Sequence, residues 1–313
     1  MATVERISKK KIRYRKKMTK GDRLFAIFAW TFFILVSLLT VYPLLHMIAL
    51  SFSGKEDLAH SGGLYLIPES PTLENYKEFL FNRINVPQAF LVTTARTVLG
   101  TVTALLANAF LAYILSRKKF LFKSGLSLFW IFTMYAAAGY IPTIVLFMRL
   151  HLTNSFWVYI IPGMVSAFHV LVIKTYMENI PDSLEESAQL EGAGHLKIFW
   201  SVVSPICKPV YAAIAFFIAV SHWNSWFDAF LFNRMAQKYT TLQFEIMKYL
   251  TTIFSSQTGT ISTNAVVIEE VHRPAVQALI PAACVLTMLP VIILYPFFQK
   301  HFINGLRIRG VKD

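Results

Sequence analysis

The densest group of side chains with binding chemistry lies between residues 222 and 228. Within this stretch the chain places aromatic rings beside hydrogen-bonding groups: His222, Trp223, Asn224, Trp226 and Asp228. A sugar ring presents apolar C–H patches and hydroxyl groups, so this mixture is suited to carbohydrate. Tryptophan also gathers at membrane interfaces as an aromatic belt. Asn224 and Asp228 are more than a belt requires, and both interpretations stand at this point.

Three ionisable residues lie within or at the end of apolar segments: His169, Arg96 and Arg149. Such groups usually face the protein interior or a cavity, so each is a candidate for a substrate pathway. For His169, a hydrogen bond to a neighbouring helix is the more ordinary role. Arg96 lies about 12 Å into its segment at 1.5 Å per residue, within snorkelling reach of the surface. We expect both arginines to be interface anchors, unless the substrate carries carboxylates with which they pair.

The sequence contains no recognisable catalytic or metal site. Gly54-Lys55-Glu56 is the nearest approach to a phosphate-binding loop, but Ala49 stands where that motif needs its first glycine. Glu56 likewise stands where the motif needs Ser or Thr. Cys207 and Cys284 are too few for a disulfide framework and lack metal-ligand spacing. We therefore predict a chain that is not itself an enzyme and holds no cofactor.

The composition places these residues in a membrane protein. Of the 313 residues, 55% are hydrophobic and 15% are charged, whereas a soluble domain carries about 25% charged residues. The mean hydropathy is +0.51, and a water-soluble enzyme cannot bury so much apolar surface around one core. The net charge of +13 does not indicate a nucleic-acid binder, because the basic residues stand between long apolar runs and not on a polar face.

Six segments are long and apolar enough to cross a bilayer, which takes about 20 residues per helix. They cover about 24–50, 88–115, 124–148, 156–176, 206–231 and 275–299. The first is too long for a signal peptide and no cleavage site follows it, so we expect it to be retained. We predict an all-α membrane protein with one six-helix domain at 24–299 and two outer loops at 51–87 and 232–274.

The basic residues predict that both ends of the chain lie in the cytoplasm. The side that would hold both termini carries 21 Lys and Arg residues, against 9 on the other side. Ten of the 21 lie in the tail 1–23, and four lie in the tail 300–313. Cytoplasmic loops carry such an excess in membrane proteins. The basic tail is also suited to contact anionic lipid.

The connection 177–205, on the side of the termini, has the pattern of a folded segment. A proline–aspartate pair ends the fourth span and opens a short helix. A serine and a glutamate three residues apart are spaced as a capping box, and two glycines are suited to end the helix. Such a helix either docks into a groove of another protein or serves only as an interfacial anchor. In chain order these residues are Pro181, Asp182, Ser183, Glu186, Gly192 and Gly194.

The spacing within this loop resembles a known motif. Glu186-Ser187-Ala188, Gly192, and Val202 to Pro205 match the EAA loop of ABC importer permeases, which has the pattern E-A-A-x3-G-x9-I-x-L-P. Ser187, Val202 and Ser204 depart from the pattern, and each is a small change. The chain also resembles the sugar-transporting branch of that family at 112–120, 141–142, 152–157 and 222–228. The ending 295–302 is similar to the oligosaccharide and polysaccharide sub-branch, which includes permeases assigned to aldouronate-type substrates.

The resemblance implies a fold, a mechanism and partners. The fold would be that of a type I ABC importer permease in a bacterial cytoplasmic membrane. A second homologous permease would complete the pathway, two ATPase subunits would bind ATP and Mg²⁺, and an extracytoplasmic sugar-binding protein would deliver the oligosaccharide. The loop would act as a coupling helix in a cleft of one ATPase, with Glu186 in contact and Pro205 setting the angle into the fifth span. The implied coupling residues are Glu185, Glu186, Ser187, Ala188, Gly192, Ala193 and Pro205.

Two other functions are weighed against this one. A secondary transporter driven by an ion gradient favours internal repeats and acidic residues at the midplane. No repeat is evident, and the first four spans contain no Asp or Glu. A membrane-anchored assembly subunit without a transport role is the other alternative. A tightly held ATPase distinguishes the importer from both.

Overall fold

The computed structural model describes residues 19–54, 66–68, 70–82, 86–118, 120–136, 139–257 and 273–309. This part of the chain is almost entirely helical, with an isolated bridge between Ser53 and Pro71. Most of the basic tail 1–23, parts of the predicted outer loops 51–87 and 232–274, and the end of the tail 300–313 lie outside the described residues.

The helical elements follow one another along the chain with few long connections. They are α1 (Lys20–Phe52), α3 (Glu74–Lys77), η1 (Glu78–Asn82), α4 (Val86–Ser116), α5 (Lys123–Tyr135), α6 (Tyr140–Arg149), η2 (Phe156–Tyr159), α7 (Ala167–Met177), α8 (Asp182–Leu190), α9 (His195–Ile198), η3 (Phe199–Val203), α10 (Ser204–Ile206), α11 (Lys208–Asn224), α12 (Phe227–Phe232), η4 (Gln237–Tyr239), α13 (Leu242–Gln257) and α14 (Arg273–Arg309).

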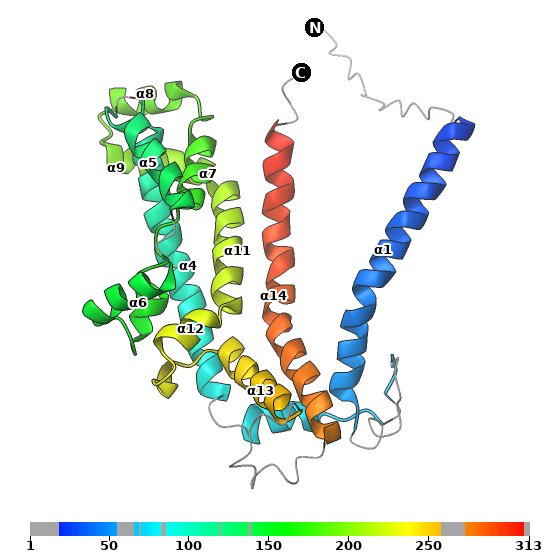
Figure 1. Cartoon of the computed structure of the whole chain (residues 1–313). Helices are drawn as coiled ribbons and strands as arrows, with labels where there is room; N and C mark the ends of the chain where they lie inside the picture. Colours follow the sequence, from blue (N-terminus) through cyan, green and yellow to red (C-terminus); the bar gives the residue numbers. More distant parts are fainter. Residues whose placement is uncertain are drawn as a thin grey trace, which may run out of the picture.

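Helix α4 lies at the centre of the packing. The largest group of buried apolar side chains lies where α4 meets α7, α11 and η3, and it includes Tyr113, Ile173, Phe199 and Ile214. Helix α14 packs against α11 and also against α1. We call the end of the molecule that carries α8 the α8 end, and the opposite end the α13 end. The start of α1 and the end of α14 both lie at the α8 end (Figure 1).

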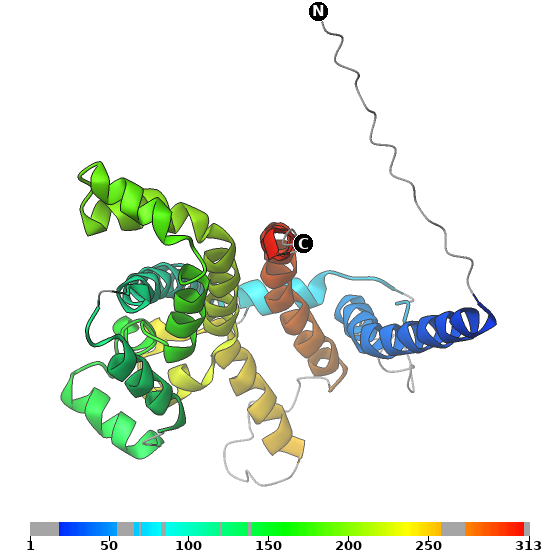
Figure 2. The same ribbon diagram turned by 90° about the horizontal axis from the view of Figure 1, so that it is seen from above.

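Helix α1 diverges from the rest of the molecule. It meets α14 near the α13 end and leans away toward the α8 end, and the view from above shows the same separation (Figures 1 and 2). Thr19 caps its start, because the Thr19 hydroxyl accepts from the Asp22 backbone N–H at 3.2 Å and Asp22 accepts from the Thr19 N–H at 2.9 Å. None of its most apolar stretch is buried within this chain.

Among the residues that the structure describes, three helices are long and apolar enough to cross a membrane alone: α1, α4 and the part of α14 from Ala278 to Gln299. They correspond to the first, second and sixth predicted spans. Counting each of two sharply bent helix pairs as one span raises the number to five. Helix α14 continues to Arg309, so the backbone of the predicted tail 300–313 is helical over most of its length.

The third, fourth and fifth predicted spans are not single helices. The segment 124–148 is divided between α5 and α6, and Gly139 adopts a positive φ of 81° at the start of α6. The segment 156–176 contains a short 3-10 turn and then α7 of only 11 residues. The segment 206–231 ends its long helix at Asn224, and α12 follows separately. Apolar composition alone does not reveal these breaks, because interrupted segments keep the same hydropathy.

Asn108 holds the interrupted fourth segment against α4. Its side-chain amide donates to the Ala104 carbonyl at 2.5 Å and to the Met164 carbonyl at 3.0 Å. Its carbonyl oxygen accepts from the Ser166 N–H at 2.9 Å. Non-helical backbone at membrane depth persists only where its polar groups find partners within the protein. A fully buried asparagine supplies those partners just before α7 begins.

Helices α4 and α11 approach closely at Gly100. A Cβ atom added there would lie 2.5 Å from Nε2 of His222, well inside van der Waals contact. Ala104 and Ala109 on the same helix are also buried. The small size of these residues allows the neighbouring helices to come near.

Candidate functional site

The predicted coupling helix is α8, at the α8 end of the molecule (Figure 1). The helix begins at Asp182, directly after Pro181, as the proline–aspartate pair predicted, but no side chain caps its start. Ser183 therefore lies inside the first turn, where its carbonyl accepts from the Ser187 hydroxyl at 2.8 Å. The predicted capping box of Ser183 and Glu186 is wrong. Asp182 and Glu185 in the first turn instead place negative charge at the positive helix end.

The end of α8 agrees with the prediction. Gly192 has a φ of 78°, a conformation that glycine adopts without the steric cost that a Cβ imposes. Its N–H donates to the Gln189 carbonyl at 2.9 Å, and the Ala193 N–H donates to the Ala188 carbonyl at 3.0 Å. This pair of bonds is the Schellman arrangement that closes a helix.

One face of α8 is open to a partner, and the other packs on this chain. Ala188 and Ala193 are half-buried and pack against the main core. Glu186 and Ser187 are exposed, and the Leu190 side chain is 90% exposed. No atom lies within 4 Å of the place that a Cβ of Gly192 would occupy. The outward face therefore combines a carboxylate, a bare glycine and an apolar side chain.

Ion pairs join α8 to the connection that follows α4. Glu185 pairs with Arg117, and both side chains are largely enclosed, at 15% and 18% exposed. Asp182 pairs with Lys118 in a more open position, at 58% and 77% exposed. The hydrogen bond from Lys118 to Asp182 raises the pKa of that lysine, whereas burial lowers the pKa of Arg117. Glu185, predicted to belong to the coupling surface, is thus engaged within this chain.

The chain turns sharply between the segment after α8 and α11. The helical stretch 195–206 and α11 meet at 81°, with Pro205 just before the bend and Pro209 just after it. Because Pro209 has no N–H, the helical hydrogen bond back to Pro205 is absent at this point. Pro205 therefore lies at the bend, as predicted, but it shares that position with a second proline.

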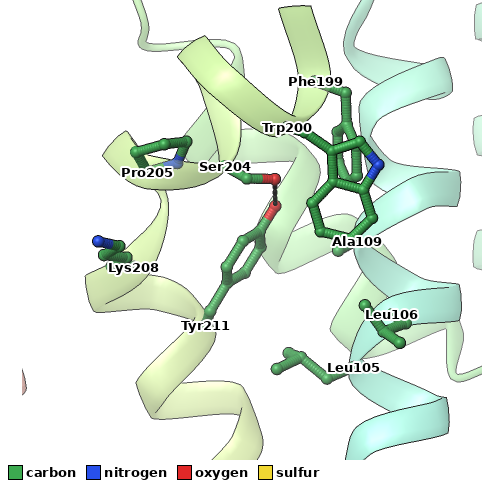
Figure 3. Close-up of a pocket in the computed structure, with 9 residues that line it drawn as sticks. All are labelled: Leu105, Leu106, Ala109, Phe199, Trp200, Ser204, Pro205, Lys208 and Tyr211. Atoms are coloured by element: carbon green, nitrogen blue, oxygen red, sulfur yellow. Dashed lines mark hydrogen bonds between the residues drawn. The ribbon is translucent and has the colours of Figure 1, made fainter. Parts of the chain in front are cut away.

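An apolar groove of about 260 Å³ lies inside this bend (Figure 3). Leu105, Leu106 and Ala109 of α4 form one wall, and Phe199 and Trp200 lie opposite. The hydroxyl groups of Ser204 and Tyr211 lie 3.3 Å apart at its edge, and Lys208 is exposed beside them.

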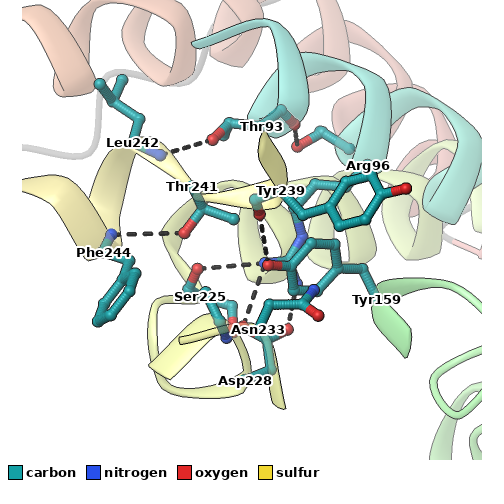
Figure 4. A network of polar contacts seen from close by, with 12 residues as sticks. Thr93, Arg96, Tyr159, Ser225, Asp228, Asn233, Tyr239, Thr241, Leu242 and Phe244 are labelled. Atoms are coloured by element: carbon teal, nitrogen blue, oxygen red, sulfur yellow. Dashed lines mark hydrogen bonds and ion pairs between the residues drawn. The ribbon is translucent and has the colours of Figure 1, made fainter. Parts of the chain in front are cut away.

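A second polar group lies toward the α13 end and is built around Arg96 (Figure 4). Arg96 is 2% exposed and forms a two-point contact with the carboxylate of Asp228. Its guanidinium carbon lies 4.3 Å from the centre of the Tyr159 ring, and it also donates to the Ser225 carbonyl at 3.3 Å. The predicted snorkelling of Arg96 to the interface is wrong, because a carboxylate 132 residues further along the chain reaches it inside the protein.

The same network ties several non-helical stretches together. The Tyr159 hydroxyl donates to the Tyr239 carbonyl at 2.6 Å, and the Asn233 amide donates to the Ser155 carbonyl at 3.0 Å. The Leu242 N–H donates to the Thr93 hydroxyl at 2.9 Å, which joins the start of α13 to α4. These bonds hold η2, α12 and α13 on the first third of α4 (Figure 4).

The residues of the 222–228 group have different environments. Trp223 is 7% exposed, and its indole N–H donates to the Thr287 carbonyl of α14 at 2.9 Å, so it is neither a belt residue nor an open sugar platform. Trp226 is half-buried and packs on Phe227 and Phe230. Asn224 is exposed and accepts a long bond from Gln243 at 3.4 Å.

The remaining candidates stand apart from one another. His222 packs on Gly100 beside the Arg96 network. His169 is half-buried on α7 with its ring next to Phe168. Arg149 is exposed in the last turn of α6 and takes no part in the Arg96 network. The structure therefore brings together Arg96, Asp228 and His222, but not His169 or Arg149.

Sequence reasoning missed Asn108, Tyr159 and Arg117. Asn108 carried a signal, since a buried asparagine in the middle of an apolar segment must satisfy its amide within the protein. Tyr159 and Arg117 carried none beyond their position near segment ends. Their importance comes from partners that are distant in the chain.

Comparison with known proteins places the chain in a family. No family model matches it. The chain is 32% identical over 93% of its length to the polygalacturonan/rhamnogalacturonan transport system permease protein YtcP of Bacillus subtilis, and the match covers 99% of that protein. It is 33% identical over 94% of its length to protein LplC of the same organism, of which 97% is covered.

A solved structure agrees with these relatives. The chain superposes with a TM-score of 0.78 and 27% identity on a chain of a bacterial ABC transporter involved in the import of the acidic polysaccharide alginate, covering 92% of this chain and 99% of that one. The likeness extends over nearly the whole length of each protein. The chain belongs to the family of permease subunits of carbohydrate ABC transporters.

Proposed function

We propose that this chain is one membrane-spanning subunit of an ATP-driven importer of oligosaccharides that contain uronic acids. It lies in a bacterial cytoplasmic membrane with both ends in the cytoplasm, and its six crossings form half of the pathway. A second homologous permease forms the other half. Two ATPase subunits bind ATP and Mg²⁺ beneath it, and an extracytoplasmic sugar-binding protein delivers the substrate.

The geometry of α8 is the observation that carries this proposal. A short helix stands at the same end as the start of α1 and the end of α14 (Figure 1), and its outward face presents Glu186, Leu190 and the bare backbone of Gly192. A protruding helix with small and charged groups on its open face suits a cleft in a partner protein. Movement of that partner would reach the membrane domain as rigid-body rotation.

The exposure of helix α1 is evidence for a second membrane subunit. None of its most apolar stretch is buried within this chain, and on this side of the molecule α1 leans away from α14 toward the α8 end (Figures 1 and 2). A helix that is apolar on all sides is buried by a neighbour or by lipid. We infer that a homologous permease and membrane lipid together cover this side.

The names of the relatives support the substrate class. YtcP is named for polygalacturonan and rhamnogalacturonan, and the structural neighbour for alginate, and each of these glycans contains uronic acid. Within this chain, Arg96 has its charge matched by Asp228, so we do not expect it to pair with a substrate carboxylate. Asn224, His169 and Arg149 remain the accessible pathway candidates.

The test is to reconstitute the importer in vesicles and to measure ATP hydrolysis and sugar uptake with a panel of neutral and uronate-bearing oligosaccharides. We expect uronate-bearing sugars to stimulate both, and an ionophore that collapses ion gradients to leave uptake intact. Stimulation by neutral sugars alone would refute the substrate class. Uptake that follows an ion gradient and needs no ATP would refute the importer.

A matched pair of glycine variants tests the coupling role of α8. Gly192→Val places a side chain on the open face at a φ of 78°, which costs about 1–2 kcal/mol in backbone strain and obstructs a partner. Gly194→Val adds the same group two residues away, where the backbone is extended and no atom lies within 4 Å of the added Cβ. We expect Gly192→Val to weaken ATPase binding and uptake, and Gly194→Val to retain more of both. If both variants bind the ATPase and take up sugar as well as the wild type does, the coupling role of α8 is contradicted.

A further inference from the structure

The attachment of α8 to the rest of this chain depends on few contacts. No residue of α8 is fully buried, and its apolar contact with the main core comes from Ala188, a small side chain. Its first turn, in contrast, carries two ion pairs to the connection after α4. A helix that receives force from another protein needs a firm attachment, and the more enclosed of these two ion pairs, Arg117–Glu185, is where the structure supplies one.

The Arg117 side chain is fixed by contacts with α4 in addition to its ion pair with α8. Its Nε donates to the Tyr113 carbonyl at 3.3 Å and to the Ser116 hydroxyl at 3.0 Å, and its Nη2 donates to the same hydroxyl at 2.8 Å. The guanidinium carbon lies 4.5 Å from the centre of the Tyr113 ring. These contacts leave Nη1 directed at the Glu185 carboxylate. A guanidinium fixed from several sides loses little further freedom when it pairs.

The last turn of α4 also contacts the chain after α8. The Tyr113 hydroxyl donates to the His195 carbonyl at 3.3 Å, and its ring lies 5.1 Å from that of Phe199. Arg117 and Tyr113 thus reach the residues on both sides of the Gly192 turn. The end of α4 therefore contacts both α8, through Glu185, and the start of α9, through His195.

The neighbouring ion pair is of a different kind. Lys118 and Asp182 are 77% and 58% exposed, and pairs as open as this contribute little because water and salt screen them. Arg117 and Glu185 are 18% and 15% exposed, where screening is weaker. The chain therefore offers an enclosed pair and an open pair on the same two elements.

We propose that Arg117 is a positioning residue that clamps the coupling helix to α4 through Glu185, so that displacement of α8 by the ATPase moves α4 directly as well as α7 and α11. This inference rests on the proposed function, because it requires an ATPase that pushes on α8. The inference nevertheless goes beyond the proposed function, since α8 could bind an ATPase without any fixed link to α4. Helix α4 carries Asn108 and Arg96, so a clamp at its end transmits movement to both polar centres of the molecule.

The first test compares charge reversals in the reconstituted importer. Arg117→Glu and Glu185→Arg each place like charges together, and the double variant restores an opposite pair. We expect each single variant to keep its ATPase but to transport about tenfold less sugar per ATP hydrolysed, and the double variant to recover most of the loss, as coupled residues do. Lys118→Glu is the matched control and should transport as the wild type does.

If Arg117→Glu transports as much sugar per ATP as the wild type, the proposed role of Arg117 is wrong. It is also wrong if the double variant transports as little sugar per ATP as the single variants. If the wild-type chain itself holds no ATPase, the proposed function fails and not the clamp alone. These two failures are distinguishable because the first is seen only among variants and the second in the unaltered importer.

A distance measurement tests the clamp without relying on a variant at Arg117. Spin labels are placed at two exposed positions, Phe110 on α4 and Gln189 on α8, after Cys207 and Cys284 are replaced. We expect the distance between the labels to be the same with and without ATP, because α4 and α8 move together. A distance that changes with the nucleotide would overturn the proposal. Glu185→Gln should broaden the distance distribution in both states.

Discussion

Arg96 lies on α4 and Asp228 on α12, and each neutralises the charge of the other where little water reaches them. Tyr159 covers the guanidinium with its ring, and Ser225 donates its hydroxyl to the Asp228 carboxylate at 2.9 Å. An enclosed pair of this kind adds limited stability relative to apolar residues, but removing one partner leaves the other charge unmatched. At the scale of single residues, this pair is where substitution has the largest consequence.

We predict that Arg96→Ala destabilises the protein through the unmatched Asp228 carboxylate. The loss in unfolding free energy should be about 3 kcal/mol, the lower end of the range for broken buried pairs, because the Asp228 side chain is 25% exposed. Thermal unfolding of the purified chain in detergent measures it. Arg149→Ala is the control, since that arginine is exposed and should change stability by less than about 0.5 kcal/mol. Equal melting temperatures for the two variants would show that the pair contributes nothing.

At the scale of elements, the approach of α4 to α11 depends on the absence of a single Cβ. The His222 ring occupies the space over Gly100, with Nε2, Cε1 and Cδ2 all within 3 Å of where a Cβ would lie. Neither helix can move outward freely, because α4 is also held by Asn108 and α11 by Trp223, whose indole N–H bonds to α14.

Gly100→Ala should therefore separate the two helices and destabilise the protein by about 1–3 kcal/mol, the usual cost of overpacking. His222→Ala in the same chain should recover part of this loss, because the side chain that clashes is then absent. Gly125→Ala serves as the matched control on α5, where no atom lies within 4 Å of the added Cβ. Helix content and melting temperature are the measurements. A Gly100→Ala variant as stable as the control would contradict the close approach.

How well the sequence predicted each element depends on how local its signal is. Long apolar runs predicted α1, α4 and α14, because a helix that is apolar throughout needs no particular neighbour. Gly192 predicted the end of α8, because a positive φ is a property of one residue. The predicted capping box at Ser183 was wrong, since the N-cap position belongs to Pro181, two residues earlier. The break before α7 was not predicted, because the Met164 carbonyl and the Ser166 N–H are satisfied by Asn108, which is distant in the chain.

At the scale of the whole molecule, the distribution of basic residues predicts which end faces which side of the membrane. The start of α1, the end of α14 and α8 lie at one end, and α12 and α13 lie toward the other (Figure 1). The excess of basic residues in the tails and in the loops beside α8 favours the cytoplasm for the α8 end.

Cysteine labelling tests this orientation in a chain whose Cys207 and Cys284 have been replaced. Leu190→Cys marks the α8 end and Met235→Cys marks the connection after α12, and both positions are strongly exposed, at 90% and 86%. In intact cells, a thiol reagent that does not cross membranes should label Met235→Cys only. Inside-out vesicles should show the reverse pattern. Labelling of Leu190→Cys in intact cells would invert the topology and refute the coupling role of α8.

The sequence by itself determined that this protein lies in a membrane, that long helices cover the first, second and sixth apolar segments, and that a short helix closed by Gly192 lies between the fourth and fifth apolar segments. Each of these follows from composition or from the conformation of one turn. Only the tertiary structure decided that Arg96 pairs with Asp228, that Trp223 bonds to α14, and that Glu185 faces Arg117. Such contacts join residues far apart in the chain, and their energy depends on the enclosure that the packed helices create.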